Sequence, residues 1–128
     1  MTFRFSSSSL RNMEGVHPDL VAVAHRALEI TKIDFLVTEG LRTREKQIEL
    51  VRAGASRTTR SRHLTGHAID IAAWVAGGVR WDWPLYEELS RAFKQAAFEL
   101  QVPIVWGGDW KSFRDGPHYE LSRTEYPE

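Results

Sequence analysis

The segment SRHLTGHAID, residues 61–70, limits what this chain can fold into more than any other stretch. Its histidines, His63 and His67, are four residues apart, a spacing that can place two metal ligands on one face of a helix. Gly66 between them disfavours a helix, and the residues that follow alternate between the two faces of a strand. On a strand, His67 and Asp70 point to opposite faces. We therefore expect a turn followed by a strand, with His63 folding back over Asp70.

Asp70 most needs a partner in this segment, because an unpaired carboxylate among apolar strand residues costs several kcal/mol. The chain has no cysteine, so a metal ion would be held by His, Asp or Glu. His118 follows an Asp-Gly-Pro sequence that keeps the chain extended, which makes it the best third ligand. Spacing alone leaves two interpretations equally open: a metal site of His63, Asp70 and His118, or three hydrogen-bonded polar residues.

The distribution of apolar residues predicts one mixed domain spanning residues 1–128. Because helices and strands do not alternate regularly, we expect an α+β fold with a small, mostly antiparallel sheet flanked by helices. The predicted helices cover 18–30, 44–53 and 84–100, and the predicted strands cover 33–40, 68–74, 102–106 and 118–121. The remaining segments are predicted to be an N-terminal arm at 6–9, a turn at 76–83 and an irregular loop at 107–117. His17 is expected to act in a local turn, and His25 to lie on the surface.

Charge and hydropathy exclude several classes of function. The 17 basic and 17 acidic residues give a formal net charge of zero, which argues against nucleic-acid binding through a strong overall field. No apolar segment is long enough to cross a bilayer, and the first residues do not form a signal peptide. We therefore expect a soluble, cytosolic protein with no membrane or nucleic-acid partner. A nucleic-acid site would have to use the arginines Arg52, Arg57, Arg60 and Arg62.

Two motifs in this order resemble those of a known enzyme family. SRHLTGHAID follows the pattern S-x-H-x-x-G-x-A-x-D, and DGPHYE, residues 115–120, contains a later Asp/Glu-x-x-His element. Both are similar to motifs of the zinc D,D- and L,D-peptidases related to VanY and VanX. Together with GLRT and GGDW, they most resemble the L-alanyl-D-glutamate endopeptidases that bacteriophages use as endolysins. The resemblance covers nearly the whole chain and implies the hedgehog/D-Ala-D-Ala-peptidase-like fold.

The resemblance also implies a site and a reaction. His63, Asp70 and His118 would bind Zn²⁺, Asp115 would be the catalytic acid/base, and Arg42 would orient the substrate. Zinc with three such ligands lowers the pKa of bound water to about 7 and polarises a scissile carbonyl. The implied substrate is bacterial peptidoglycan. The protein is expected to be a monomer that is made in the host cytoplasm and reaches the wall after a holin-type partner opens the membrane.

Several alternatives remain open at this point. The metal site does not separate an L-Ala-D-Glu endopeptidase from a D-Ala-D-Ala carboxypeptidase, and a zinc-containing wall-binding module without catalysis is a further candidate. The acidic residue at Asp115 counts against that module. Arg42 can instead form an ordinary surface ion pair, and Glu120 can be solvated instead of orienting a ligand. Trp106 and Trp110 can form a cleft wall or simply pack in the domain.

Overall fold

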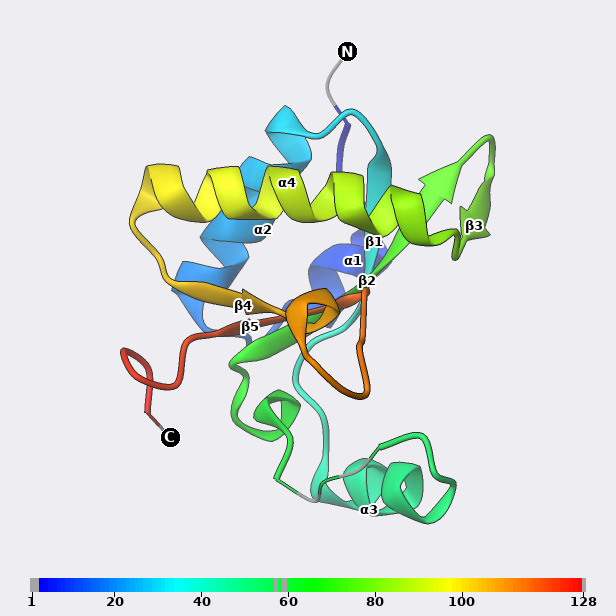
Figure 1. Ribbon diagram of the computed structural model, residues 1–128, viewed down its shortest axis with the longest axis vertical. Helices are drawn as coiled ribbons and strands as arrows, with labels where there is room; N and C mark the ends of the chain where they lie inside the picture. Colours follow the sequence, from blue (N-terminus) through cyan, green and yellow to red (C-terminus); the bar gives the residue numbers. More distant parts are fainter. Residues whose placement is uncertain (1–2, 57, 59, 128) are drawn as a thin grey trace.

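The computed structural model describes residues 3–56, 58 and 60–127 and has the α+β architecture expected from the sequence (Figure 1). Four strands lie in the order β1-β2-β5-β4, a short strand β3 also pairs with β2, and every pairing is antiparallel. The strands are β1 (Asp34–Glu39), β2 (Ala68–Val75), β3 (Gly78–Arg80), β4 (Ile104–Trp106) and β5 (His118–Leu121). The helices are α1 (Ser7–Asn12), α2 (Pro18–Ile30), α3 (Arg44–Arg52) and α4 (Trp83–Leu100), with 3₁₀ turns η1 (Arg62–Thr65) and η2 (Gly107–Asp109).

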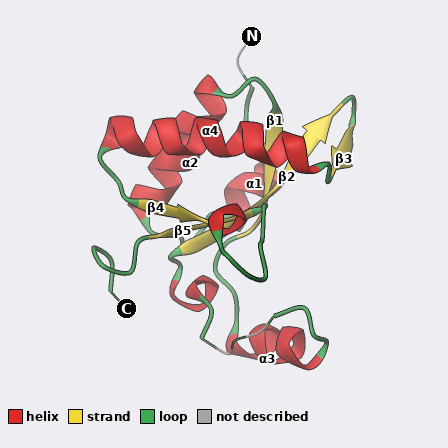
Figure 2. Cartoon of the chain, in the orientation of Figure 1, coloured by secondary structure: helices red, strands yellow, loops and turns green. Residues whose placement is uncertain are grey.

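Helices α2 and α4 pack against each other and against one face of the sheet (Figure 2). Pro18 occupies the first turn of α2, and the His17 ring accepts a hydrogen bond from the backbone N–H of Asp19. His17 thus has the local role expected from the sequence. Each helix turns an apolar stripe toward the sheet, including Leu20, Val23 and Ala27 of α2 and Leu89, Phe93 and Ala96 of α4.

Strand β2 lies at the centre of the sheet and has two chemically different faces. Ile69 and Ile71 are fully buried and belong to the core shared with the helices. Asp70 lies between them in the sequence and therefore projects from the opposite face. The core side of β5 continues this layer, because the ring of Tyr119 stacks on Phe93 of α4 with 3.9 Å between centroids. The face of the sheet that carries Asp70 is thus free for a site.

The predicted arm at residues 6–9 is wrong, because these serines begin helix α1. The side chain of Ser6 caps the helix by accepting a hydrogen bond from the Ser9 backbone N–H at 3.1 Å. The buried Ser9 hydroxyl then accepts from the backbone N–H of Val37, and Asn12 donates to the Val37 carbonyl. The serine run therefore caps a helix, and it also provides a hydrogen-bond acceptor for the Val37 backbone N–H on the outer edge of β1.

The predicted turn at 76–83 is correct only in part. Ala76 and Gly77 have positive φ angles of 53° and 81°, as a two-residue hairpin turn requires. The chain then returns as β3, in which Val79 lies opposite Trp74 of β2, and α4 already begins at Trp83. The remaining predicted helices and strands occur within a few residues of their expected bounds.

Within the ranges that the structure describes, no helix combines the length and apolarity needed to cross a membrane.

The close approach of α1 to the end of β1 yields a stability prediction. A Cβ atom at Gly40 would lie against the backbone oxygen of Asn12 and 2.6 Å from Cγ2 of Val16. We expect Gly40→Ala to lower the free energy of unfolding by about 1–3 kcal/mol, measured by urea denaturation. Gly78→Ala is the control, because no heavy atom lies within 4 Å of a Cβ there, and it should change stability by less than about 0.5 kcal/mol. Equal stability of the two variants would contradict this packing.

Candidate metal centre and cleft

Three elements bring His63, Asp70 and His118 together. Asp70 and His118 are direct partners in the antiparallel pairing of β2 with β5, so their side chains lie on the same face of the sheet. His63 comes from η1, the turn that precedes β2. Gly66 ends that turn with a φ of 76°, and a Cβ there would meet the backbone oxygen of Gly15. Glycine at this position therefore lets the chain return into β2 with His63 above Asp70.

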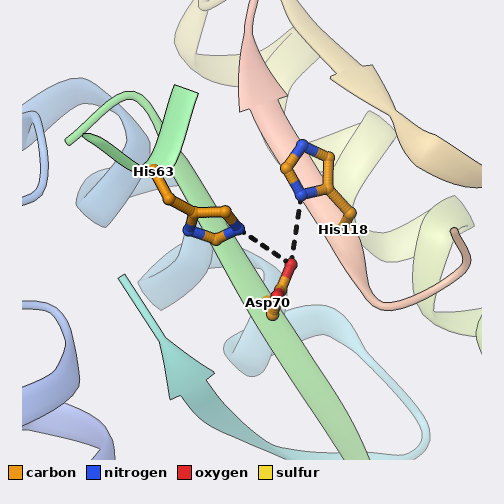
Figure 3. A group of neighbouring side chains, drawn as sticks. All are labelled: His63, Asp70 and His118. Atoms are coloured by element: carbon orange, nitrogen blue, oxygen red, sulfur yellow. Dashed lines mark hydrogen bonds and ion pairs between the residues drawn. The ribbon is translucent and has the colours of Figure 1, made fainter. Parts of the chain in front are cut away.

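The three side chains converge on one point (Figure 3). Oδ1 of Asp70 is 3.2 Å from Nε2 of His63 and 3.1 Å from Nδ1 of His118. One candidate ligand atom from each residue lies within 4.8 Å of the other two, and both histidines are buried. Two imidazoles and a carboxylate at this spacing are a donor set that can hold a divalent metal ion.

The outward-facing nitrogen of each histidine is also fixed. Nδ1 of His63 donates a hydrogen bond to the carbonyl of Gly40 at 2.8 Å, which leaves Nε2 to face Asp70. Nε2 of His118 lies 2.8 Å from Oε1 of Glu120, which leaves Nδ1 to face Asp70. The Glu120 side chain is only 10% exposed, so it is not solvated and instead orients the ring of His118. Partners of this kind select the tautomer and ring orientation that a metal needs.

The electrostatics of the cluster favour positive charge at its centre. Burial lowers the pKa of His118, but its hydrogen bonds with Asp70 and Glu120 outweigh this effect and raise the pKa to about 9. Burial opposes ionisation of Asp70 as well, yet hydrogen bonds from His118 and His63 hold the pKa of Asp70 well below its usual range. Two ionised carboxylates therefore surround the histidines, and the cluster stabilises a cation between them.

Asp115 lies close to this cluster without being part of it. Its backbone N–H donates to the carbonyl of Gly107 at 3.0 Å, and its carbonyl accepts from the backbone N–H of His118 at 3.2 Å. Burial, followed by the negative charge of Asp70, raises the pKa of Asp115. Within the described residues, its carboxylate has no hydrogen bond or ion pair. A half-buried carboxylate with a raised pKa and no partner is suited to accept a proton.

Arg42 is not the surface residue that one sequence-based alternative described. Its side chain is only 8% exposed, and its guanidinium pairs with the carboxylate of Glu39 and donates to Oε1 of Gln47 at 2.6 Å. The same group lies 3.7 Å from Oδ2 of Asp70. Gln47 is fully buried and also donates to Ser56. Arg42 therefore connects β1, the metal cluster and the α3 segment through buried contacts.

These residues line a cleft of about 700 Å³. Its lining includes the three candidate ligands together with Asp115, Arg42 and Trp110. The Trp110 ring lies 5.1 Å from that of His118 between centroids, so Trp110 is part of the cleft wall. Trp106 is instead buried in the core, where its indole N–H donates to the carbonyl of Gly116 at 2.7 Å and anchors the loop that carries Asp115.

The other histidines lie outside the cluster. Nδ1 of His67 is 2.6 Å from the Thr65 hydroxyl, and its ring lies beside that of His17 at 5.8 Å between centroids. His25 is exposed on α2 and packs edge-on against Phe5. The structure thus brings His63 and His118 together and places His67, His17 and His25 outside the cluster.

The arginine set proposed for nucleic-acid binding does not form one surface. Arg62 is fully buried, and its guanidinium donates to the carbonyls of Leu121 at 3.1 Å and Tyr126 at 2.7 Å. Its function is thus to fix the C-terminal segment against η1. Arg57, another member of that set, lies outside the described residues.

The antiparallel α+β fold and the His-Asp-His cluster beside an unpaired aspartate are features typical of a metal-dependent hydrolase. Comparison with known proteins narrows it, because the family model for the phage L-alanyl-D-glutamate peptidase matches residues 1–125. The chain therefore belongs to the phage L-alanyl-D-glutamate peptidase family.

Individual relatives agree with this assignment. The L-alanyl-D-glutamate peptidase of Escherichia phage T5 is 35% identical over 130 residues, which cover 98% of this chain and 94% of that protein. The peptidase of the same name from Listeria phage A118 is also 35% identical and is matched over 98% of this chain but 45% of its own length. This chain thus spans less than half of the Listeria phage protein.

Solved structures show the same fold. The crystal structure of the Serratia marcescens L-Ala D-Glu endopeptidase ChiX has a TM-score of 0.93 and 48% sequence identity, over 98% of this chain and 95% of that one. The vancomycin-resistance D,D-dipeptidase VanXYg has a TM-score of 0.54 at 20% identity, over 83% of this chain and 50% of that one. The expected structural relationship to the VanX-like peptidases is confirmed at the level of the fold.

The geometry of the cluster predicts which histidines bind a divalent metal. We expect His63→Ala and His118→Ala each to abolish stoichiometric metal binding, because each removes one of three donors. His67→Ala should retain the metal, since its ring points to His17 and Thr65. Metal content measured by elemental analysis after gel filtration, with circular dichroism to check folding, tests both expectations. Metal loss in folded His67→Ala would overturn the ligand assignment.

Proposed function

We propose that this chain is a zinc peptidase that hydrolyses the L-alanyl-D-glutamate bond of peptidoglycan stem peptides during phage lysis of the host. The observation that carries the proposal is the His63, Asp70, His118 cluster with the unpaired Asp115 in the same cleft. The named activity of the phage and Serratia relatives supports the choice of bond. Two imidazoles, which would be neutral when bound to the metal, and one carboxylate match the donor set of a catalytic zinc site, in which one position would be left for water.

In the proposed mechanism, a zinc ion held by these three residues supplies Lewis-acid polarisation of the scissile carbonyl and a lowered pKa for water. Glu120 and the Gly40 carbonyl hold the two imidazoles with their donor nitrogens facing inward. Asp115 accepts a proton from the attacking water at its carboxylate oxygen and then delivers it to the leaving amine of D-glutamate. The raised pKa of Asp115 favours the first of these steps, because it makes the carboxylate a stronger base toward the attacking water.

Arg42 has a supporting role in this proposal. Peptidoglycan stem peptides carry free carboxylates, and a guanidinium is suited to orient them. The contacts of Arg42 with Glu39 and Gln47 hold its positive charge at one place beside Asp70. We propose that Arg42 acts as a fixed cation that orients the substrate in the cleft and keeps the Asp70 carboxylate ionised.

The biological setting is part of the same proposal. We propose that the protein is an endolysin that acts as a monomer on the wall after a holin-type partner has opened the host membrane. The phage origin of two relatives supports the role in lysis. Neither nucleic acid nor a membrane is required for the proposed reaction.

The bond and the metal are tested together on purified peptidoglycan. We expect the zinc-loaded protein to release a new amine terminus on D-glutamate, identified by mass spectrometry of the digest. Removal of zinc with a chelator should abolish the release, and addition of zinc should restore it. Products cut at the D-Ala-D-Ala bond would instead assign a carboxypeptidase, and no release by zinc-loaded protein would refute the proposed function.

The role of Asp115 separates an enzyme from a wall-binding module. We expect Asp115→Asn to keep the fold and the bound zinc but to reduce kcat by about 10²–10⁴-fold, because the amide cannot accept the proton. Zinc content and turnover are measured on the same preparation. Turnover near that of the wild type would exclude Asp115 as the base, whereas loss of zinc would make it a ligand.

A further inference from the structure

An exposed apolar surface lies at the end of β2 that is remote from the metal centre. We call it the hairpin surface; it consists of Trp74 on β2, Val79 on β3 and Trp81 just beyond β3, which are 37%, 40% and 63% exposed. Trp74 and Val79 are direct cross-strand partners. Trp81 stacks on the buried Tyr86 with an angle of 5° between the rings, so its position is fixed by the core. Apolar side chains grouped in this way on a surface indicate a binding function.

Trp74 and its partner Val79 share one face of the sheet with the metal centre. Along β2, Asp70, Ala72 and Trp74 project to the same side, because side chains alternate along a strand. The intervening Ile71 and Ala73 point into the core beneath the helices. The register with β1 shifts between Val37 and Glu39, but the extra residue lies on β1, so the alternation along β2 is kept from Ala68 to Val75.

The distance between the two places matches the chemistry of the proposed substrate. Trp74 is four residues from Asp70, which is about 13 Å along a strand. In peptidoglycan, the L-alanine of the stem peptide is joined through a lactyl group to an amino sugar of the glycan strand. These two units together are about 7 Å long when extended. When the L-Ala-D-Glu bond is at the metal centre and the L-alanine side runs along β2, these units end about 6 Å short of Trp74, a gap that one sugar ring spans.

We propose that the hairpin surface binds the glycan strand that carries the stem peptide, with Trp74 as its central contact. This inference rests on the proposed function, because it requires that the bond next to L-alanine is placed at the metal centre. It adds that the enzyme recognises sugars on the L-alanine side of that bond.

The chemistry of the surface suits a polysaccharide. The flat apolar faces of sugar rings pack against indole rings, and an indole also offers one N–H donor for a hydroxyl. Within the described part of the chain, the Trp74 indole N–H has no hydrogen-bond partner. The neighbouring charges are neutralised by each other, since Arg80 forms a two-point ion pair with Asp82 at 2.8 Å and 3.1 Å. The surface therefore presents apolar rings and a free donor beside one carboxylate, that of Asp34, which is the cross-strand partner of Trp74 on β1.

The test compares one enzyme on two substrates. KM and kcat are measured on soluble glycan strands that carry stem peptides and on free stem peptide without sugar. We expect Trp74→Ala to raise KM on the glycan strands about tenfold relative to KM on the free stem peptide, because the indole no longer covers a sugar ring. The value of kcat should change little. Trp74→Phe should keep the ratio of KM on glycan strands to KM on free stem peptide close to that of the wild type. An unchanged ratio in Trp74→Ala would overturn the proposal.

Phe98→Ala is the matched control. Phe98 is an 80% exposed aromatic residue on α4, which covers the opposite face of the sheet, so its removal should leave both KM values unchanged. An equal effect of Phe98→Ala and Trp74→Ala on the ratio would also overturn the proposal. If the wild-type protein cleaves neither substrate, the proposed function itself fails, and the two failures are thus distinguishable.

A direct binding measurement separates sugars from a second copy of this chain as the occupant. Denuded glycan strands, from which the stem peptides have been removed, are titrated into isotopically labelled protein, and the indole N–H signals are followed by nuclear magnetic resonance. We expect the Trp74 signal to shift and to be the signal lost in Trp74→Phe. A wild-type dimer in sedimentation that Trp74→Ala converts to monomer would assign the surface to self-association and refute the glycan proposal.

Discussion

The pairing of the Asp70 carboxylate with two histidines is the interaction on which the rest of the site depends. A carboxylate on a central strand of a sheet costs several kcal/mol unless it is paired. Here His63 and His118 approach the same carboxylate oxygen at 3.2 Å and 3.1 Å. Removing either histidine would therefore remove both a proposed metal ligand and a partner that keeps Asp70 ionised. The proposed metal site and the stability of the surrounding sheet are therefore coupled through the Asp70 carboxylate.

The antiparallel register extends this pairing in both directions. Asp70 lies opposite His118 on β5 and opposite Glu39 on β1, which pairs with Arg42. Glu39 and Asp70 are both acidic, and the basic side chains that lie against them are Arg42, His63 and His118. Glu120 contacts the outer side of His118. The negative groups hold both imidazoles with fixed tautomers, and Arg42 offsets part of the negative charge. A metal cation adds to an arrangement that is already ordered by hydrogen bonds.

The sequence predicted the parts of the fold and site that depend on local pattern. Alternation after Gly66 placed Asp70 and His67 on opposite faces, and the Asp-Gly-Pro sequence marked the approach to His118. Other features depend on contacts between distant segments, which no local pattern contains. Ser9 becomes part of α1 because its hydroxyl satisfies the edge of β1 at Val37.

The role of Glu120 shows the same limit at the level of a single residue. Its i+2 position on the strand of His118 allowed both an orienting role and a solvated one, and only its burial and 2.8 Å contact decide between them. Arg62 was grouped with exposed basic residues because of its sequence neighbours, yet its guanidinium binds the carbonyls of a C-terminal segment about 60 residues away. The i+2 position of Glu120 and the basic neighbours of Arg62 in the sequence are local features, and neither contains information on these contacts.

The central claim is that Asp70 and the inward-facing nitrogens of His63 and His118 together hold a zinc ion. Anomalous diffraction at the zinc absorption edge, on crystals of the zinc-loaded protein, tests it most directly. We expect one strong anomalous peak within coordination distance of Nε2 of His63, Nδ1 of His118 and a carboxylate oxygen of Asp70. The Glu120 carboxylate should remain hydrogen-bonded to Nε2 of His118. A peak bonded to Nε2 of His118, to Glu120 or to His67 would contradict it.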